Sequence, residues 1–203
     1  MRIGLFGGTF NPVHNGHIAL AEAALSAFSL DRILFMPGFI TPFKQGQTLA
    51  SPEDRLAMLR LATADNPRFE VSTLELGRGG VSYTVHTLEA LRAARPDDDL
   101  WLLVGLDSLL SLGRWYRAHD ILKLATVGTL LRPGTTLPEG DLPGFSSGET
   151  ALLRTHIANG DCPDIASSAI RAALNEGQDV STLLPCPVAS YISSHKLYRN
   201  DAP

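Results

Sequence analysis

Short apolar runs alternate with amphipathic stretches along most of the chain. Strands are predicted at residues 2–6, 33–36, 69–76, 99–104 and 125–131. Helical spacing predicts helices at residues 16–28, 51–64, 82–94, 167–174 and 188–197. Strands that alternate with helices form parallel sheets, and the unbroken apolar run at 101–104 is typical of a strand buried on both faces. The pattern therefore predicts an α/β fold, a mostly parallel sheet with helices on both faces.

One domain spanning residues 1–203 is the predicted organisation. A chain of 203 residues has the size of an ordinary α/β domain. Residues 133–148 are rich in Gly, Pro, Thr and Ser, and no self-sufficient core sequence follows them. We therefore expect this stretch to be a surface loop rather than a linker.

Composition narrows the class of protein. Hydrophobic residues make up 44% and charged residues 19%, which is enough apolar material for a core. The net charge of −4, with only 17 Lys and Arg, argues against a nucleic-acid partner. The chain has no signal-peptide pattern and no run of ~20 apolar residues, and Cys162 and Cys186 have no metal-ligand spacing. These features predict a soluble, cytoplasmic protein that binds no membrane.

The segment after the first predicted strand carries the candidate chemistry. It reads Gly-Gly-Thr-Phe-Asn-Pro-Val-His-Asn-Gly-His over residues 7–17. Its glycines let backbone N–H groups approach a phosphate closely. His14 and His17 are three residues apart at a helix start, so we expect them on one face, over the positive end of the helix dipole. Two imidazole donors there would stabilise charge developing on a phosphoryl group.

Two other interpretations of this segment are weaker. A zinc site would need a third ligand, which the opening segment does not supply, so no metal-binding residue is predicted. A dehydrogenase would show Gly-x-Gly-x-x-Gly and an acidic residue after the second strand, where this chain has Met36 and Pro37.

The 7–17 segment resembles the signature of the nucleotidyltransferase superfamily, and most closely that of nicotinate-mononucleotide adenylyltransferases. Further resemblances follow in the family's order at residues 82–88, 105–108, 115–116, 132–134, 165–171 and 184–192. The resemblance implies a Rossmann-like, doubly wound parallel sheet. Class I aminoacyl-tRNA synthetases share the histidine pair but are far longer.

Residue roles follow from the resemblance alone. It implies that the catalytic residues are His14, His17, Lys44 and Arg171. The implied ATP-binding residues are Gly7, Gly8, Thr9, Phe10, His17, Asp107, Arg132, Ser168 and Arg171. The implied substrate-binding residues are Thr84, Trp115, Tyr116 and Lys44. On spacing alone, Asp107 could instead cap a helix, Ser168 could be an N-cap, Arg171 could be a surface residue and Trp115 could belong to the core.

Two departures from the family pattern concern the substrate. Where the family usually reads Pro-Pro-His-Lys, this chain reads Thr-Pro-Phe-Lys at residues 41–44, so Lys44 is kept and the histidine is replaced by Phe43. His86 stands where an acidic residue is common. Asn11 for aspartate and Ala166 for serine are milder changes.

The implied reaction transfers AMP from ATP to nicotinate mononucleotide and releases pyrophosphate, which gives nicotinate adenine dinucleotide for NAD biosynthesis. No protein nucleophile is needed, because a phosphate monoester is already ionised, and Mg²⁺ would be carried mainly by ATP. Two alternatives stay open: an adenylyltransferase for another phosphorylated substrate such as nicotinamide mononucleotide, and a non-catalytic nucleotide sensor. The sequence also leaves a homo-oligomer open.

Overall fold

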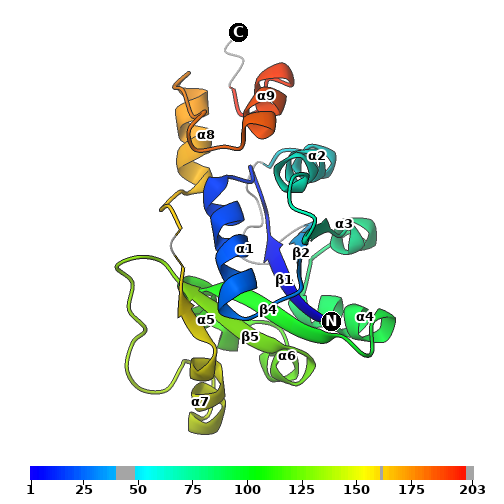
Figure 1. The fold of residues 1–203 in the computed structure, drawn as a ribbon, viewed down its shortest axis with the longest axis vertical. Coiled ribbons are helices and arrows are strands. Elements are labelled where there is room, and N and C mark those ends of the chain that lie inside the picture. Colours follow the sequence, from blue (N-terminus) through cyan, green and yellow to red (C-terminus); the bar gives the residue numbers. More distant parts are fainter. Residues whose placement is uncertain (40–48, 161, 200–203) are drawn as a thin grey trace.

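A six-stranded, fully parallel sheet forms the centre of the computed structural model, which describes residues 1–39, 49–160 and 162–199 (Figure 1). The strand order is β3-β2-β1-β4-β5-β6. The strands are β1 (Arg2–Gly8), β2 (Arg32–Pro37), β3 (Phe69–Val71), β4 (Asp99–Gly105), β5 (Thr126–Leu131) and β6 (Ile157–Asn159). This is the doubly wound parallel sheet that the sequence predicts.

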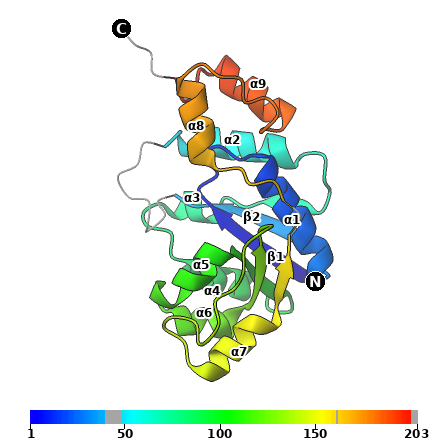
Figure 2. The same ribbon diagram turned by 90° about the vertical axis from the view of Figure 1, so that its left-hand side faces the viewer.

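The connections between the strands are helical. In chain order the helices are α1 (Asn15–Ala27), α2 (Pro52–Thr63), α3 (Leu74–Arg78), α4 (Thr84–Ala94), α5 (Leu106–Ser111), the 3₁₀ helix η2 (Leu112–Arg114), α6 (Ala118–Leu124), α7 (Ser147–Thr155), α8 (Ser167–Asn175) and α9 (Cys186–Ser194). Helices α8 and α9 lie beside α2 at one end of the molecule, and α7 lies at the other end (Figures 1 and 2).

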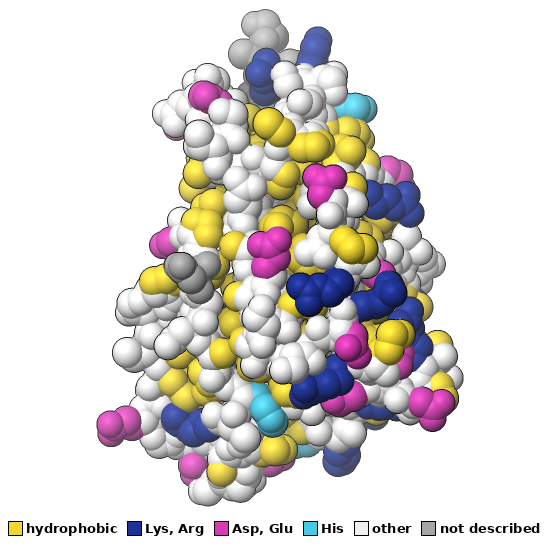
Figure 3. Space-filling view, in the orientation of Figure 1, with side chains coloured by type: hydrophobic (Ala, Val, Ile, Leu, Met, Phe, Trp, Pro, Cys, Tyr) yellow, Lys and Arg dark blue, Asp and Glu magenta, His cyan; other side chains and the backbone are white. Residues whose placement is uncertain are grey.

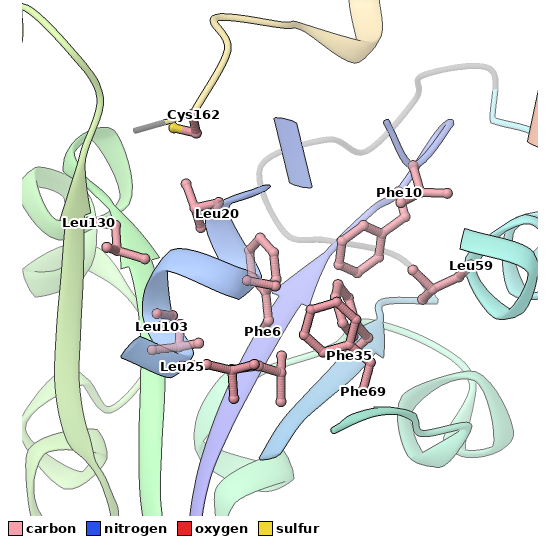
Figure 4. Close-up of a cluster of buried hydrophobic side chains, with 14 of the residues drawn as sticks. Phe6, Phe10, Leu20, Leu25, Phe35, Leu59, Phe69, Leu103, Leu130 and Cys162 are labelled. Carbon is pink, nitrogen blue, oxygen red and sulfur yellow. The ribbon is translucent and has the colours of Figure 1, made fainter. Parts of the chain in front are cut away.

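Two hydrophobic clusters cover the two faces of the sheet. Alternate residues of β1 divide between them, because Leu5 joins the cluster with α4, α5 and α6, whereas Phe6 joins the cluster with α1, α2, α8 and α9. In the cluster that contains Phe6, the ring of Phe6 lies 5.5 Å and the ring of Phe69 lies 5.2 Å from the ring of Phe35, between β1, β2 and α2 (Figure 4). The sheet is therefore buried on both faces, as the apolar strands predict.

The predicted strand at residues 69–76 is wrong beyond Val71. The N–H of Ser72 still donates to the carbonyl of Phe35, but its hydroxyl accepts from the N–H of Leu74 and turns the chain away from the sheet. Helix α3 begins at that turn. The hydrogen bond to the hydroxyl of Ser72 thus ends the strand, although the alternating sequence pattern continues to residue 76.

The loop predicted at residues 133–148 is confirmed up to Ser146. There Ser146 caps α7 and exchanges hydrogen bonds with Glu149, so the helix begins at Ser147. Helices α5, α6 and α7 and strand β6 were not predicted. The last helix covers residues 186–194 rather than 188–197, because its C-cap His195 is followed by Lys196 in a left-handed conformation, φ 50°.

The order of the strands places a crevice beside β1. Within the sheet, β2 and β3 lie on one side of β1. The chain then crosses over to β4, which pairs with the other edge of β1. The loops that follow β1 and β4 therefore diverge at their carboxyl ends. Open α/β sheets bind ligands at such a switch point.

Candidate active site

A cleft of about 500 Å³ opens at this switch point. Its lining combines the start of α1, the turn after β4, the end of β5 and the segment before α8. Four of the predicted site residues contribute to it: His14, His17, Asp107 and Arg132. The topology therefore gathers side chains that are more than 100 residues apart in the sequence.

The two histidine rings lie against each other, tilted, at the N-terminus of α1. Their ring centroids are 3.7 Å apart with an interplanar angle of 31°. His14 is the N-cap of the helix, and its backbone N–H donates to Nδ1 of His17 over 3.2 Å. Because Nδ1 is the acceptor, a neutral His17 carries its proton on Nε2. The predicted placement of the pair on one face of the helix start is confirmed.

His14 is the more deeply buried member of the pair, with 4% of its surface exposed. Burial, and secondly the positive charge of Arg132, lowers its pKa from 6.5 to about 4. The imidazole is therefore neutral at pH 7. Its Nδ1 is buried and has no hydrogen-bond partner among the described residues. Such a group is an available polar contact for a ligand in the cleft.

The loop between β1 and α1 is held by aromatic packing. Phe10 adopts a left-handed conformation, φ 48°, and its buried ring lies 5.1 Å from the ring of His17. A Cβ on Gly8 would come within 2.9 Å of the Phe10 ring, so glycine is needed there for packing, whereas Gly7 faces open space. Thr9 is buried, and its carbonyl accepts from Nη1 of Arg55 over 2.9 Å.

Helix α8 packs its first turn against the same loop. Arg171 donates from Nη1 to the carbonyl of Asn11 over 2.8 Å, and the hydroxyl of Ser167 donates to the carbonyl of Pro12 over 3.0 Å. Ser168, the next residue, is exposed, and the N-cap of α8 is Ala166 rather than Ser168. Ser168 and Arg171 lie outside the lining of the cleft.

The described lining of the cleft also carries two carboxylates and a guanidinium. Arg132, directly after β5, forms an ion pair with Asp164 at 2.8 Å, and both side chains are largely exposed. Asp107 is exposed in the first turn of α5, whose N-cap is Gly105, so Asp107 does not take the N-cap position. A bound phosphate could compete with Asp164 for Arg132.

A second group of predicted residues lies at the start of α4. Thr84 is its first residue, and the rings of Tyr83 and His86 lie 4.8 and 5.6 Å from the ring of Tyr116. Trp115 packs partly against the core, as the alternative interpretation expected. Its buried Nε1 has no hydrogen-bond partner within residues 1–39, 49–160 and 162–199. This aromatic group is separate from the cleft lining.

The remaining predictions concern the loop at Lys44, metal binding and membrane spans. Lys44 and Phe43 lie outside the described residues. Across the described ranges, no three His, Cys, Asp or Glu side chains gather into a metal site. No helix among the described residues is long and apolar enough to cross a bilayer.

Arg55 and Tyr198 belong to the site region and were not predicted. Arg55 is 1% exposed and donates to carbonyls of the loops after β1 and β2. The hydroxyl of Tyr198 donates to Oδ1 of Asn11 over 2.8 Å, across 187 positions. A charged residue among the apolar residues of a helix, as Arg55 is in α2, was the signal that could have identified it.

The parallel sheet, the switch-point cleft and the histidine pair at a helix N-terminus define a nucleotide-binding α/β protein of the nucleotidyltransferase class. Residues 5–173 match the model of the cytidylyltransferase-like family.

Curated relatives cover nearly the whole chain. One, named a probable nicotinate-nucleotide adenylyltransferase of Herpetosiphon aurantiacus, is 42% identical over 198 residues, 97% of this chain and 98% of the relative. A relative of the same name from Citrifermentans bemidjiense is 40% identical and covers 98% of both chains. The chain therefore belongs to the nicotinate-nucleotide adenylyltransferase family.

Solved structures agree on the fold. The nicotinic acid mononucleotide adenylyltransferase of Plasmodium falciparum, complexed with NaAD, matches 97% of each chain with a TM-score of 0.76 at 16% identity. At that identity the match shows the shared Rossmann-like fold alone.

Proposed function

We propose that the protein transfers AMP from ATP to nicotinate mononucleotide, giving nicotinate adenine dinucleotide and pyrophosphate for NAD biosynthesis. The observation that carries the proposal is the close pair of His14 and His17 rings at the helix N-terminus inside the switch-point cleft. Full-length relatives named for this activity support it.

The reaction is an in-line displacement. An oxygen of the mononucleotide phosphate forms a bond to the α-phosphorus of ATP, and the bond from that phosphorus to the bridging oxygen breaks as pyrophosphate leaves. No protein nucleophile takes part. Catalysis consists of positioning and of stabilising the negative charge that moves toward the leaving group.

The histidine pair supplies the donors for that charge. A neutral His17 carries its proton on Nε2, because Nδ1 accepts from the N–H of His14. Neutral His14 adds a second imidazole, and both stand over the positive end of the α1 dipole. The interaction strengthens as charge grows on the departing phosphate, so it accelerates the chemical step.

The other ATP contacts are proposed from position. Main-chain groups of residues 7–10 approach the phosphates, and Asp107 accepts hydrogen bonds from ribose hydroxyls. Arg132 leaves its ion pair with Asp164 and binds a phosphate or the adenine side of the nucleotide. Ser168, Arg171 and Lys44 bind phosphate. Arg171 does so while one of its nitrogens holds the carbonyl of Asn11.

The nicotinate ring is proposed to bind at the start of α4. Trp115 and Tyr116 stack on the ring, and the buried Nε1 of Trp115 is a donor that no described residue accepts from. Thr84 and the N-terminal N–H groups of α4 receive the carboxylate. A carboxamide would present N–H groups to these donors, and an unpaired buried donor costs about 1–3 kcal/mol, a preference of roughly tenfold to a hundredfold.

Mg²⁺ is the proposed cofactor, carried mainly by ATP. Among the described residues, the lining of the cleft offers two carboxylates, Asp107 and Asp164, and Asp164 is already paired with Arg132. Such a donor set fits a cation that takes most ligands from phosphate oxygens and water. When bound, the ion neutralises charge on the triphosphate.

We further propose that residues 1–203 act as one unit in the cytoplasm, without a nucleic-acid partner. Cys162 and Cys186 are not joined in a disulfide, which suits a reducing compartment. On the face shown in Figure 3, Lys and Arg side chains stand among Asp and Glu side chains rather than in a continuous basic stripe.

A pyrophosphate-release assay tests the function. ATP is supplied with nicotinate mononucleotide, nicotinamide mononucleotide or phosphopantetheine in separate reactions. We expect turnover to be fastest with nicotinate mononucleotide, by tenfold or more over the amide. Equal turnover of the amide would support the wider adenylyltransferase, and ATP binding without any pyrophosphate would support the sensor.

A further inference from the structure

Arg55 is the most deeply buried charged side chain of the described residues, at 1% exposure. It lies in α2, which covers the sheet on the side of β1 and β2. No described carboxylate forms an ion pair with it. Burying a charge without a counterion is unfavourable for stability, and an apolar side chain in this position would avoid that cost.

Backbone carbonyls take the place of a counterion. Nη1 of Arg55 donates to the carbonyl of Thr9 over 2.9 Å and to that of Gly38 over 2.8 Å, and Nη2 donates to the carbonyl of Phe39 over 3.4 Å. Thr9 follows β1, and Gly38 and Phe39 follow β2. One planar guanidinium thus joins the carboxyl-end loops of two neighbouring strands.

Each of these loops leads directly to a proposed binding element. Thr9 precedes Phe10, whose ring packs 5.1 Å from the ring of His17. On the other side, the N–H of Phe39 donates to the hydroxyl of Ser82, two residues before Thr84. Through these two loops the guanidinium therefore connects the segment before the histidine pair with the segment before α4.

We propose that Arg55 is a positioning residue that fixes the ATP-binding half of the site relative to the mononucleotide-binding half. The inference rests on the proposed function, because it concerns the alignment of the two substrates. Arg55 does not touch them. A misplacement of reacting groups by about 1 Å can cost a hundredfold in rate, so a loosened clamp lowers kcat more than it raises either KM.

Two substitutions and a matched control test this role. Arg55→Lys keeps the charge but cannot donate to three carbonyls in a fork, and Arg55→Met removes the buried charge while filling similar space. Met58→Ala disturbs the same helix at a fully buried position that is not bonded to either loop. Each variant is assayed well below its own melting temperature, with ATP and nicotinate mononucleotide.

We expect kcat to fall by about 10- to 100-fold in Arg55→Met, and by less in Arg55→Lys, with each KM changed less than fivefold. Met58→Ala should keep kcat within about twofold while its melting temperature falls. Wild-type kcat in both folded Arg55 variants, or an equal loss in Met58→Ala, would overturn the proposal and leave Arg55 a purely structural residue.

Amide hydrogen exchange gives a readout that does not depend on turnover. The N–H of Gly38 donates to the carbonyl of Gly8 over 3.0 Å, and that of Phe39 is bonded to Ser82. In the wild-type protein we expect both amides to be protected at least about 100-fold relative to an open loop. Exchange at open-loop rates would refute the clamp even if every Arg55 variant failed to fold. Protection without turnover of nicotinate mononucleotide would instead contradict the proposed function.

Discussion

Replacement of His17 separates its proposed catalytic role from its structural role. His17→Ala removes the Nε2 donor in the cleft and the Nδ1 acceptor for the N–H of His14. Losing a donor aimed at developing charge costs about 10²–10³ in kcat, or roughly 3–4 kcal/mol in the transition state. Losing the backbone acceptor costs only about 1 kcal/mol of folding stability. We therefore expect a folded protein that binds ATP within several-fold of wild type.

Two further variants divide these effects by atom. In His17→Asn the amide oxygen stands where Nδ1 stood and can accept from His14, so stability is kept while kcat stays low. In His17→Gln the longer side chain brings an amide N–H near the position of Nε2 and should recover about tenfold in kcat relative to alanine. Pyrophosphate release gives kcat, and calorimetric titration gives ATP affinity.

The reasoning would be refuted if folded His17→Ala kept more than about a third of wild-type kcat. Equal rates for the asparagine and glutamine variants would also contradict the assignment of the proton to Nε2.

Three other expectations follow from the site. The folding stability that neutral His14 contributes is fully present above pH 6.5 and is lost as the pH falls toward 4. The loss is about 3 kcal/mol at most. The urea midpoint of His14→Asn should therefore fall less steeply over that pH range than the midpoint of the wild-type protein. Gly113→Ala would place a Cβ 2.2 Å from the carbonyl oxygen of Pro143, a backbone atom that cannot rotate away, and should cost about 1–3 kcal/mol or more in urea unfolding. Lys44→Ala should lower kcat/KM for the mononucleotide more than Phe43→Ala does in steady-state assays, and wild-type kinetics would remove Lys44 from the site.

Long apolar strands and the 7–17 segment made most of the fold and half of the site predictable. Strands such as 99–104 are buried on both faces, so their composition alone indicates a central parallel strand. The histidine pair could be placed because helical spacing fixes which side chains share a face. Asp107 and Arg132 line the same cleft as the histidine pair because strands β4 and β5 end at the same edge of the sheet.

Short elements and long-range polar contacts were not predictable. Helix α6 has seven residues and begins after Arg117 in a left-handed conformation, a position where the sequence has no capping signal. Strand β3 ends at a hydroxyl that bonds the backbone two residues on. The contact between Asn11 and Tyr198, like the grip of Arg55 on two loops, depends on the assembled fold and leaves no periodic pattern in the sequence.

Transfer of label tests the central claim most directly. The protein is incubated with unlabelled ATP and with nicotinate mononucleotide whose phosphate carries ¹⁸O. The masses of the products are then measured by mass spectrometry. Direct attack of that phosphate on the α-phosphorus should give nicotinate adenine dinucleotide that retains all of the ¹⁸O, together with unlabelled pyrophosphate. Labelled pyrophosphate, or ATP bound with no dinucleotide formed, would contradict the account.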